Sequence, residues 1–398
     1  MGIQDIANTG MKSSMTNMEV ISNNISNANT IGFKKSYTNF ADLYPGSGSA
    51  SSVQAGLGVS IASIRQDFTK GGYQTTDRSL DLSINDNSFF IMRDAGTGQT
   101  CYSRAGRFNL DPNGYLLSGN NRLTGYPAVN GKILAPSLAD LKVPTLPVPA
   151  KATTEVTGSL NLDSNGAIPT STFSVSDPTS YNYATYTNVY DSQGNSAPLS
   201  LYYVKTAANE WTVKAEVNGS SAGTGSLVFA ADGSLQSATG LSSLSYSPTT
   251  GAATPQAFSV TLSGSTQYAG GSSPQPFNQD GYQAGTFSGL NIDNNGVLNV
   301  QYTNGQNIQV GQIAVADFQA PEGLMDIGNM CWVQSPTSGN PTITQNSSTN
   351  NITAGSLEIS NVDLTEEMVN LIGAQHSFQA NAQVEQTYNE VMQTIVKI

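Results

Sequence analysis

The sequence predicts a mainly β protein with α-helical termini. It comprises two β-rich domains, one inserted in the other, and a coiled-coil domain made by the N- and C-terminal segments. Three observations predict this class. Both ends carry apolar residues at steps of three and four, the middle alternates with a period of two, and two stretches rich in Pro or Gly divide it. At 398 residues the chain is long enough for several domains.

The N-terminal segment predicts the first helix. Its stripe contains one polar residue and comprises Ile3, Ala7, Met11, Ser14, Met18, Ile21, Ile25 and Ala28. Pro is absent, and Gly32 lies where a helix stop is expected. The only charged residues within this stripe's span are Asp5, Lys12 and Glu19, too few to solvate a wide outer face. A helix coated in small neutral polar residues indicates contact with copies of itself.

The C-terminal segment predicts a longer helix. Asp363 followed by Glu366 has the pattern of a capping box, and Glu367 adds negative charge near the helix N-terminus. The apolar stripe shifts once and comprises Leu364, Met368, Leu371, Phe378, Val384, Tyr388, Val391 and Ile395. A helix of about 35 residues spans ~50 Å, so its stripe needs a partner, which the N-terminal helix can supply. The alternative is that both helices pack on one globular core.

The middle of the chain predicts strands and tight turns. Leu80, Leu82 and Ile84 alternate with polar residues, as in a half-buried strand, and a more buried run follows at 89–91. Residues 211–217 alternate in the same way. Asn304-Gly305 marks a hairpin between two apolar runs.

One pattern, apolar-Asp-x-Asn-Gly-x-apolar, occurs three times, beginning at Leu110, Leu162 and Ile292. The first copy has the form of a hairpin. EF-hand calcium loops begin similarly, but the Glu that they require is replaced by Arg122, Ser174 and Asn304. Turn chemistry therefore explains all three copies.

Composition changes predict the domain boundaries. Leu141 to Thr154, with three Pro, and Tyr268 to Gly281 read as linkers, and Gly46 to Ser52 as a flexible connector. The predicted parts are 1–70 (N-terminal helix and connector), 71–146 (first segment of β-domain 1), 147–280 (inserted β-domain 2), 281–356 (second segment of β-domain 1) and 357–398 (C-terminal helix). This nesting brings the two terminal helices to the same end of the molecule.

The sequence offers no catalytic chemistry, and we expect no catalytic residues, no cofactor and no metal ligands. The single histidine, His376, lies in the C-terminal helix, and no phosphate-binding loop is present. Gly219 to Gly223 matches the letters of a nucleophile elbow, but no helical pattern follows it. The net charge of −12 argues against a nucleic-acid partner.

The two cysteines and the apolar runs bear on the compartment. Cys101 and Cys331 can pair if their strands are neighbours, and the favoured alternative is two small buried apolar residues. No apolar run has the length of a membrane span, and the N-terminus lacks the layout of a secretory signal. We therefore expect a cytosolic chain or one exported without a cleaved signal.

Two terminal signatures carry a resemblance to a known family. The stretch from Asn23 to Lys34 resembles the N-terminal signature of the flagellar axial proteins (rod, hook and hook-associated proteins), and Ser360 to Asn381 resembles their C-terminal one. Tyr102 to Leu116 is similar to the first β-domain of rod and hook subunits. Within the family the inserted domain favours a hook subunit over a distal rod subunit. The signature residues are Asn23, Asn24, Asn27, Asn29, Thr30, Gly32, Phe33, Lys34, Asn361, Val362, Asp363, Gln375, Gln379, Ala380 and Asn381.

The resemblance implies a function. Hook subunits pass unfolded through the flagellar type III export apparatus and assemble outside the cell. Their many copies form a short curved tube that joins rod to filament, transmits torque as a universal joint and encloses the export channel. The implied partners are other copies, the distal rod protein, the hook cap and the hook–filament junction proteins. The two helical stripes are the residues expected to form the inner tube.

The chain departs from the family pattern at two positions of the C-terminal helix. His376 stands where relatives commonly carry Arg, and Glu385 interrupts a seam that is usually apolar. A different class, an extracellular carbohydrate-binding or adhesive β protein, explains the middle region but leaves both terminal helices without a role.

Overall fold

The computed structural model describes residues 3–43, 56–129, 131–134, 137–345 and 352–396. The connector expected at Gly46 to Ser52 lies outside them. The chain forms two compact units. Unit 1 comprises Met1–Thr145, Gly289–Gln301 and Asn307–Ile398, and unit 2 comprises Leu146–Ser288 and Tyr302–Gln306. The expected fold class, mainly β with a helix at each end, is confirmed.

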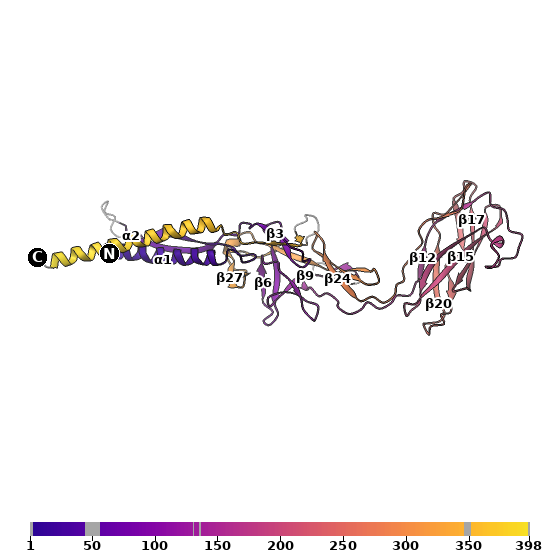
Figure 1. Cartoon of the computed structure of the whole chain (residues 1–398), viewed down its shortest axis with the longest axis horizontal. Coiled ribbons are helices and arrows are strands. Elements are labelled where there is room, and N and C mark those ends of the chain that lie inside the picture. The colour runs from indigo at the N-terminus through magenta and orange to yellow at the C-terminus, as the bar shows by residue number, and fades with distance from the viewer. Residues whose placement is uncertain (1–2, 44–55, 130, 135–136, 346–351, 397–398) are drawn as a thin grey trace. The chain divides into compact units, whose positions relative to one another are not determined.

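Two helices form one end of unit 1. The helices α1 (Ile3–Ser26) and α2 (Leu364–Val396) lie side by side and run in opposite directions (Figure 1). At the start of α2, Asp363 Oδ1 accepts the backbone N–H groups of Thr365 at 2.8 Å and Glu366 at 3.3 Å. Glu366 itself lies 3.5 Å from the Lys35 ammonium, so Asp363 caps the helix without the return bond of a capping box.

A hairpin packs against α1. It consists of β1 (Ser36–Asp42) and β2 (Val59–Gln66), antiparallel with a bulge after Asn39. The Ser13 hydroxyl, buried in α1, donates to Val59 O at 3.5 Å, and the Thr38 hydroxyl donates to Asn17 Oδ1 at 2.6 Å. One side of α1 is therefore occupied by this hairpin rather than by the other helix.

The β part of unit 1 is a large sheet in which the strands do not follow one another in chain order. Its main path runs β24-β25-β26-β9-β5-β6-β28-β27, with β7, β8, β10, β11 and β29 attached, and two small pairs, β3–β31 and β4–β30, lie beside it. The strand bounds are β3 Tyr73–Thr75, β4 Leu82–Ile84, β5 Phe89–Asp94, β6 Thr100–Ser103, β7 Asn109–Leu110, β8 Leu116–Ser118, β9 Asn121–Val129, β10 Lys132–Ile133, β11 Ala139–Asp140, β24 Phe287–Ile292, β25 Val297–Tyr302, β26 Asn307–Asp317, β27 Met325–Gly328, β28 Cys331–Val333, β29 Thr342–Gln345, β30 Ile352–Ala354 and β31 Ser356–Glu358. A 3-10 turn, η2, spans Pro321–Gly323.

Aromatic residues fill the core of unit 1. Phe89 packs edge-on against Phe68, Phe318 and Trp332, with ring centroids 5.6, 5.8 and 5.9 Å away. These rings come from β5, β28 and the segments beside them. The core therefore packs residues from the first third of the chain against residues from the last third.

Unit 2 is a β-sandwich. A five-stranded antiparallel sheet, β14-β15-β16-β17-β18, shares one core with a four-stranded sheet and a three-stranded sheet. Trp211 lies in this core, and its indole N–H donates to Gln267 Oε1 at 2.7 Å. The bounds are β12 Glu155–Thr157, β13 Leu160–Asp163, η1 Pro178–Ser180, β14 Tyr183–Tyr190, β15 Ser196–Ala207, β16 Glu210–Val217, β17 Ser220–Phe229, β18 Leu235–Thr239, β19 Leu244–Tyr246, β20 Gln256–Thr261, β21 Thr266–Tyr268, β22 Ser273–Pro274 and β23 Asn278–Gln279.

The three Asp-x-Asn-Gly turns are confirmed. Asp111 and Asp293 each accept the backbone N–H four residues on, at 2.6 and 2.9 Å, and each closes a hairpin. Asp163 ends β13, whose neighbours are β21 and β22, so this copy is a turn without a hairpin. The Asn304-Gly305 hairpin between β25 and β26 is also confirmed.

Two local expectations are wrong. The strand at 79–85 was expected to bury one face, but Ser83 is as buried as Leu82 and Ile84 because other segments of unit 1 cover both faces of β4. The stretch 268–281 was expected to be a linker, but β22 and β23 pair there with β13 and β12 and complete the smaller sheets of unit 2.

Candidate functional site

The two helices pack in one antiparallel register. Ile3 and Tyr388 line the same hollow, a Cβ added at Gly10 would lie 2.8 Å from Asn381, and Ile21 and Asn370 line another hollow. In this register the first described residue of α1 lies opposite residue 388. The last turns of α2 therefore continue past the start of α1, as Figure 1 shows.

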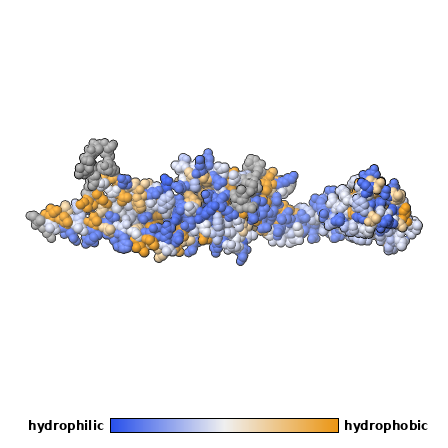
Figure 2. Space-filling model, turned by 90° about the horizontal axis from the view of Figure 1, so that it is seen from above, coloured by the Kyte–Doolittle hydropathy of each residue, from blue (hydrophilic) through white to orange (hydrophobic). Residues whose placement is uncertain are grey.

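The apolar stripe expected on α2 is largely exposed. Only Glu367 and Ala374 of this helix are buried. Leu364, Met368, Val384, Val391 and Ile395 are exposed, Met368 at 59 %, while Leu371, Phe378 and Tyr388 are half-buried. Figure 2 shows hydrophobic side chains gathered over the helical end of unit 1. A contiguous apolar face of this kind is uncommon on the surface of a monomeric protein.

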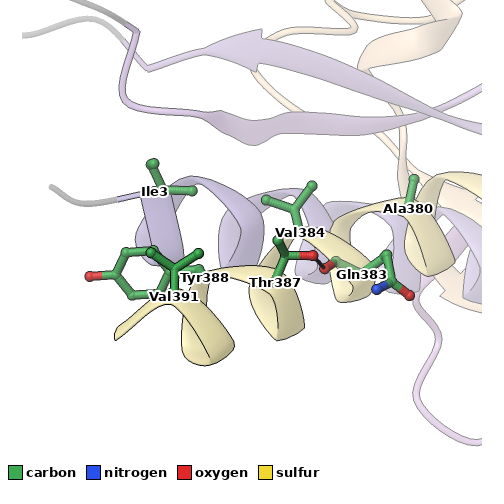
Figure 3. A pocket seen from close by; sticks show the side chains of 7 residues that line it. All are labelled: Ile3, Ala380, Gln383, Val384, Thr387, Tyr388 and Val391. Carbon is green, nitrogen blue, oxygen red and sulfur yellow. Dashed lines mark hydrogen bonds between the residues drawn. The ribbon is translucent and has the colours of Figure 1, made fainter. Parts of the chain in front are cut away.

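A hollow between the two helices continues this surface. Figure 3 shows it lined by Ile3, Ala380, Gln383, Val384, Thr387, Tyr388 and Val391. Its volume is about 520 Å³, and six of these seven side chains come from one face of α2. The hollow is nearly all apolar, so it suits another apolar side chain rather than a polar ligand.

The residues of the apolar stripe expected on α1 differ in how deeply they are buried. Ala7 and Ile21 are buried, Met11, Met18 and Ile25 are half-buried, and Ile3 is 58 % exposed. Ser13, Val20 and Asn24 are also buried because the β1–β2 hairpin covers a second side of the helix. Of the stripe, Ile3 and Ile21 line hollows shared with α2, and the sequence pattern did not indicate the second face that the hairpin covers.

The N-terminal signature forms the turn that joins α1 to β1. The Asn24 side chain forms two hydrogen bonds with the Ser36 backbone. Its Nδ2 donates to Ser36 O at 2.8 Å, and its Oδ1 accepts the Ser36 N–H at 2.9 Å. Thr30 donates its hydroxyl to Asn27 Oδ1 at 3.0 Å. Gly32 has φ +71°, donates its N–H to Glu358 O at 2.9 Å, and lies against the Arg104–Ala105 backbone. The signature amides and glycine therefore fix how the chain leaves α1.

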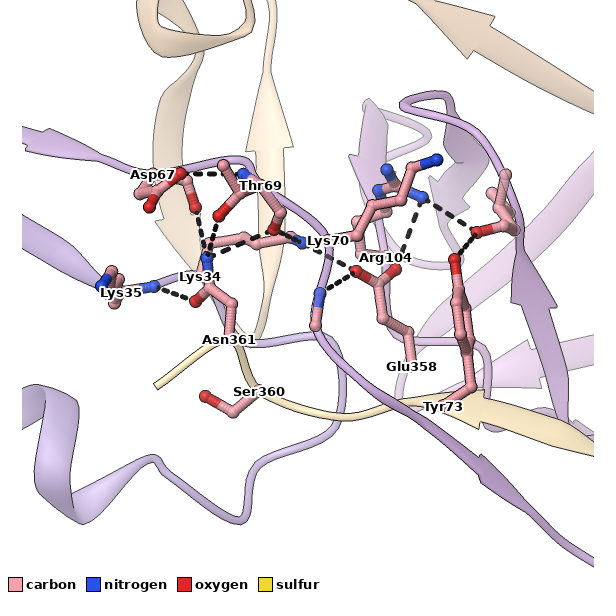
Figure 4. Close-up of polar contacts among 12 residues, drawn as sticks. Lys34, Lys35, Asp67, Thr69, Lys70, Tyr73, Arg104, Glu358, Ser360 and Asn361 are labelled. Atoms are coloured by element: carbon pink, nitrogen blue, oxygen red, sulfur yellow. Dashed lines mark hydrogen bonds and ion pairs between the residues drawn. The ribbon is translucent and has the colours of Figure 1, made fainter. Parts of the chain in front are cut away.

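A buried ion cluster lies beside this turn. Lys34 Nζ contacts Glu358 Oε1 at 2.8 Å and Thr69 O at 2.6 Å. Arg104 Nη1 lies 3.4 Å from Glu358 Oε2, and Nη2 donates to Asp86 O at 2.6 Å. Figure 4 shows the Glu358 carboxylate between the two cations. The cluster joins the N-terminal turn, the β-sheet region and the strand that leads to α2.

The protein environment shifts the pKa values of two ionisable groups in or beside this cluster. Burial lowers the pKa of Lys34 below its usual value, while the Glu358 carboxylate acts in the opposite direction. Burial and the charge of Glu358 raise the pKa of Tyr73, whose hydroxyl donates to Ile84 O at 3.0 Å. The cluster is arranged to hold structure, since its charged groups are buried and contact one another, although Arg104 Nε and Glu358 Oε2 are without a hydrogen-bond partner.

The C-terminal signature completes the same junction. Asn361 accepts the Lys35 N–H at 2.7 Å and donates to Asp67 O at 2.8 Å. Val362 N–H donates to the Ser360 hydroxyl at 3.3 Å, and Asp363 caps α2. Further along the helix, Asn381 faces Gly10 of α1 and Ala380 lines the hollow. Gln375 and Gln379 are exposed on α2, Asn23 and Asn29 are exposed, and Phe33 is half-buried.

Sequence reasoning missed Glu358, the centre of this junction. Its signal is a single acidic residue between Leu357 and Ile359, in a chain in which only 11 % of residues are charged. Such a residue is buried only when a cation accompanies it. Gly219 to Gly223, the pattern weighed as a nucleophile elbow, begins in the β16–β17 turn and continues as strand β17.

Family models match three parts of the chain. Residues 5–34 match the flagella basal body rod protein model, residues 161–282 the flagellar basal body protein FlaE D2 domain, and residues 353–398 the flagellar basal body rod FlgEFG protein C-terminal model. The two terminal matches include most of α1, most of the junction and all of α2. The fold and these matches define a structural protein of the flagellar axial class.

Relatives define the class more narrowly. The chain is 37 % identical to flagellar hook protein FlgE of Salmonella typhimurium and 36 % to that of Escherichia coli, covering 98 % of each chain in both comparisons. It is 32 % identical to the FlgE of Borreliella burgdorferi over the same shares. The chain belongs to the flagellar hook protein FlgE family, whose members are structural proteins and not enzymes.

A solved structure supports the fold. The Helicobacter pylori flagellar hook protein FlgE2 matches with a TM-score of 0.53 at 14 % identity, covering 72 % of this chain and 99 % of that one. No helix in the described part of the chain is long and apolar enough to cross a membrane.

Proposed function

We propose that many copies of this chain assemble through their terminal helices into the tube of the hook. The observation that carries the proposal is the exposed apolar face of α2, with Met368, Val391 and Ile395 at 51–59 % exposure. Burying one such side chain contributes roughly 1.5–3 kcal/mol, so a few of them per contact stabilise a helix–helix interface. The inner-tube role expected for the two stripes rests on this surface.

The proposal includes the chain's neighbours. A hook subunit works outside the cell, between a distal rod protein and the hook–filament junction proteins, beneath a hook cap, after passage through the type III export apparatus. The β-sheet part of unit 1 and unit 2 then form the outer layers of the tube, with unit 2 as the inserted domain. Torque passes from copy to copy through these contacts, and the central channel lies inside the ring of helices.

Truncation of the first helix tests the proposal. Deletion of residues 1–28 removes α1 but keeps Gly32, Lys34 and the rest of the ion cluster. We expect the shortened chain to form no tubes by electron microscopy and to give the β-rich circular dichroism of the full chain. Tubes of normal diameter from the truncated chain would contradict the proposal, and loss of the β signal would show that the deletion unfolds unit 1 instead.

A control deletion sharpens the result. Removal of residues 392–398 shortens α2 only where it continues past α1, and it keeps the groove residues Val384, Tyr388 and Val391. Because the two helices still pack, the monomer should keep its unfolding midpoint. Weaker assembly without loss of stability would assign the end of α2 to contacts between copies.

A further inference from the structure

Two buried thiols of unit 1 lie against each other. Cys101 Sγ and Cys331 Sγ are 3.3 Å apart, and the side chains are 2 % and 3 % exposed. Cys331 pairs with Ser103 across β6 and β28, and Cys101 lies two residues before Ser103 on the same face of β6. The two sulfur atoms therefore meet as diagonal neighbours on adjacent strands, although 230 residues separate them in sequence.

Hydrogen bonds give the two sulfur atoms different roles. The Cys101 thiol donates to Cys331 Sγ, and the Asn121 side-chain amide donates to the same sulfur at 3.1 Å. The Cys101 bond is the main cause that lowers the pKa of Cys331, while that bond and burial raise the pKa of Cys101. Negative charge is therefore favoured on Cys331, which makes it the nucleophile of the pair.

A small reagent has a route to these sulfur atoms. Both cysteines line a partly open hollow of about 590 Å³, together with polar residues that include Asp94, Ser118, Asn120 and Asn121. β28 is next to the last strand of the sheet, with only β27 beyond it. The local backbone is a tight turn, since Asn329 and Met330 both have positive φ (56° and 54°) immediately before Cys331.

We propose that Cys101 and Cys331 form an intrachain disulfide when the chain meets a low-molecular-weight disulfide. The Cys331 thiolate attacks one sulfur of the reagent, which forms a mixed disulfide and releases the first small thiolate. Cys101 then attacks the Cys331 sulfur, loses its proton to the solvent and releases the second small thiol. Two cysteine thiols are oxidised and one reagent disulfide is reduced to two thiols.

Little movement is needed for this bond. A disulfide has a sulfur–sulfur distance of about 2.05 Å, so the two atoms approach by roughly 1.3 Å. Rotation of the Cys101 side chain on β6 and of the Cys331 side chain at the start of β28 can supply such a shift. On oxidation the Asn121 amide loses the Cys331 thiolate as its hydrogen-bond acceptor. Asn121 lines the polar hollow, where water can accept this hydrogen bond instead.

The disulfide would be a covalent cross-link that stabilises unit 1. It closes a loop from residue 101 to residue 331, which contains the main segment of unit 2 and both connections to it. Cross-linking so long a loop restricts the unfolded chain strongly. The biological value of the bond rests on the proposed function: a chain that remains unfolded inside the cell and works outside it would be fastened only in oxidising surroundings.

The experiment uses the purified full-length chain. One sample is incubated with excess oxidised glutathione and another with dithiothreitol, and both are alkylated and digested without reduction. We expect a linked pair of peptides that contains Cys101 and Cys331 in the oxidised sample, lighter by two hydrogen atoms than the separate peptides. The unfolding midpoint of unit 1 should rise by roughly 10 °C on oxidation.

Matched variants complete the test. Cys101→Ser and Cys331→Ser should each give no linked peptide and no rise in midpoint. A glutathione on each cysteine separately, two thiols that persist in the folded chain, or covalent dimers would overturn the proposal. The assay uses unassembled chain, so its failure leaves the proposed tube assembly intact, and a failure of assembly leaves the disulfide result intact.

Discussion

The Lys34 ammonium and the Glu358 carboxylate are 2.8 Å apart, with both side chains at most 1 % exposed, although 324 residues separate them in sequence. Lys34 follows α1, and five residues separate Glu358 from Leu364, the first residue of α2. Arg104, from the β-sheet region, lies on the other carboxylate oxygen at 3.4 Å. The Glu358 carboxylate thus connects three parts of unit 1: the segment after α1, the segment before α2 and the β-sheet region.

Replacement of Glu358 should destabilise unit 1 strongly. Glu358→Gln leaves Lys34 and Arg104 buried without their counter-charge, a change that typically costs about 3–5 kcal/mol. Denaturant unfolding followed by circular dichroism measures this free energy. Lys35→Met is the control, because Lys35 and Glu366 form an exposed pair at 3.5 Å that contributes at most about 1 kcal/mol. Equal effects of the two variants would contradict the role given to the buried cluster.

A side chain at Gly32 should destabilise unit 1. Its φ of +71° disfavours other residues, and an added Cβ would lie 2.6 Å from the Ala105 backbone nitrogen. Gly98 is a matched control, with φ +72° and open space around it. Gly98→Ala should cost about 1–2 kcal/mol from the backbone alone. Gly32→Ala should exceed it by about 1–3 kcal/mol, because the crowded backbone must shift.

Gly32, Lys34 and Glu358 differ in how far the sequence alone reveals them. The signature around Gly32 and Lys34 was recognised from the sequence, because its spacing is local. Glu358 was missed, since its partners lie in segments far away in the chain and no periodic pattern marks them. Charge pairing over long separations depends on the tertiary fold, which local periodicity does not encode.

The fold shows the same division. Asn113-Gly114 and Asn304-Gly305 marked hairpins correctly, because a tight turn depends on the residues within it. Burial of Ser83 and the pairing of residues 273–274 with β13 depend on neighbours supplied by other segments. Alternation along 79–85 therefore predicted a strand but not that both of its faces are covered.

A charge on the exposed face of α2 should prevent assembly without unfolding the chain. Val391 is 51 % exposed and lines the apolar hollow, so Val391→Asp places a carboxylate where another chain is expected to bury that face. Asn389→Asp introduces the same charge at a polar exposed position of the helix. Sedimentation of polymers should fall sharply for Val391→Asp and remain near normal for Asn389→Asp. Similar loss in both would indicate a general charge effect.

Asp94 should contribute to the acid sensitivity of unit 1. Hydrogen bonds from the Thr97 backbone N–H and hydroxyl, together with Asn120, lower the pKa of Asp94 from 3.8 to about 2. The folded state therefore binds a proton less readily than the unfolded state. The stabilisation is complete above the usual pKa and is lost as the pH falls from about 3.8 to about 2. Asp94→Asn should flatten the fall in unfolding free energy over this window, and parallel curves for both proteins would contradict the assignment.

The two tryptophans should report the two units separately. The chain has two, Trp211 in the core of unit 2 and Trp332 in that of unit 1. Each unit has its own buried core, so each should unfold in its own transition. Trp332→Phe leaves fluorescence that follows unit 2, and Trp211→Phe leaves fluorescence that follows unit 1.

A core substitution in each background then tests whether the two transitions are independent. Leu201 is buried in unit 2, and Leu201→Ala should lower the unfolding free energy reported by Trp211 by about 2–5 kcal/mol. The curve reported by Trp332 should stay unchanged, because the substitution removes no contact from unit 1. Leu82 is buried in unit 1, and Leu82→Ala should leave a similar cavity there. This substitution should lower the unfolding free energy reported by Trp332 and leave the curve reported by Trp211 unchanged. If either substitution moved both curves together, the two cores would form one cooperative unit.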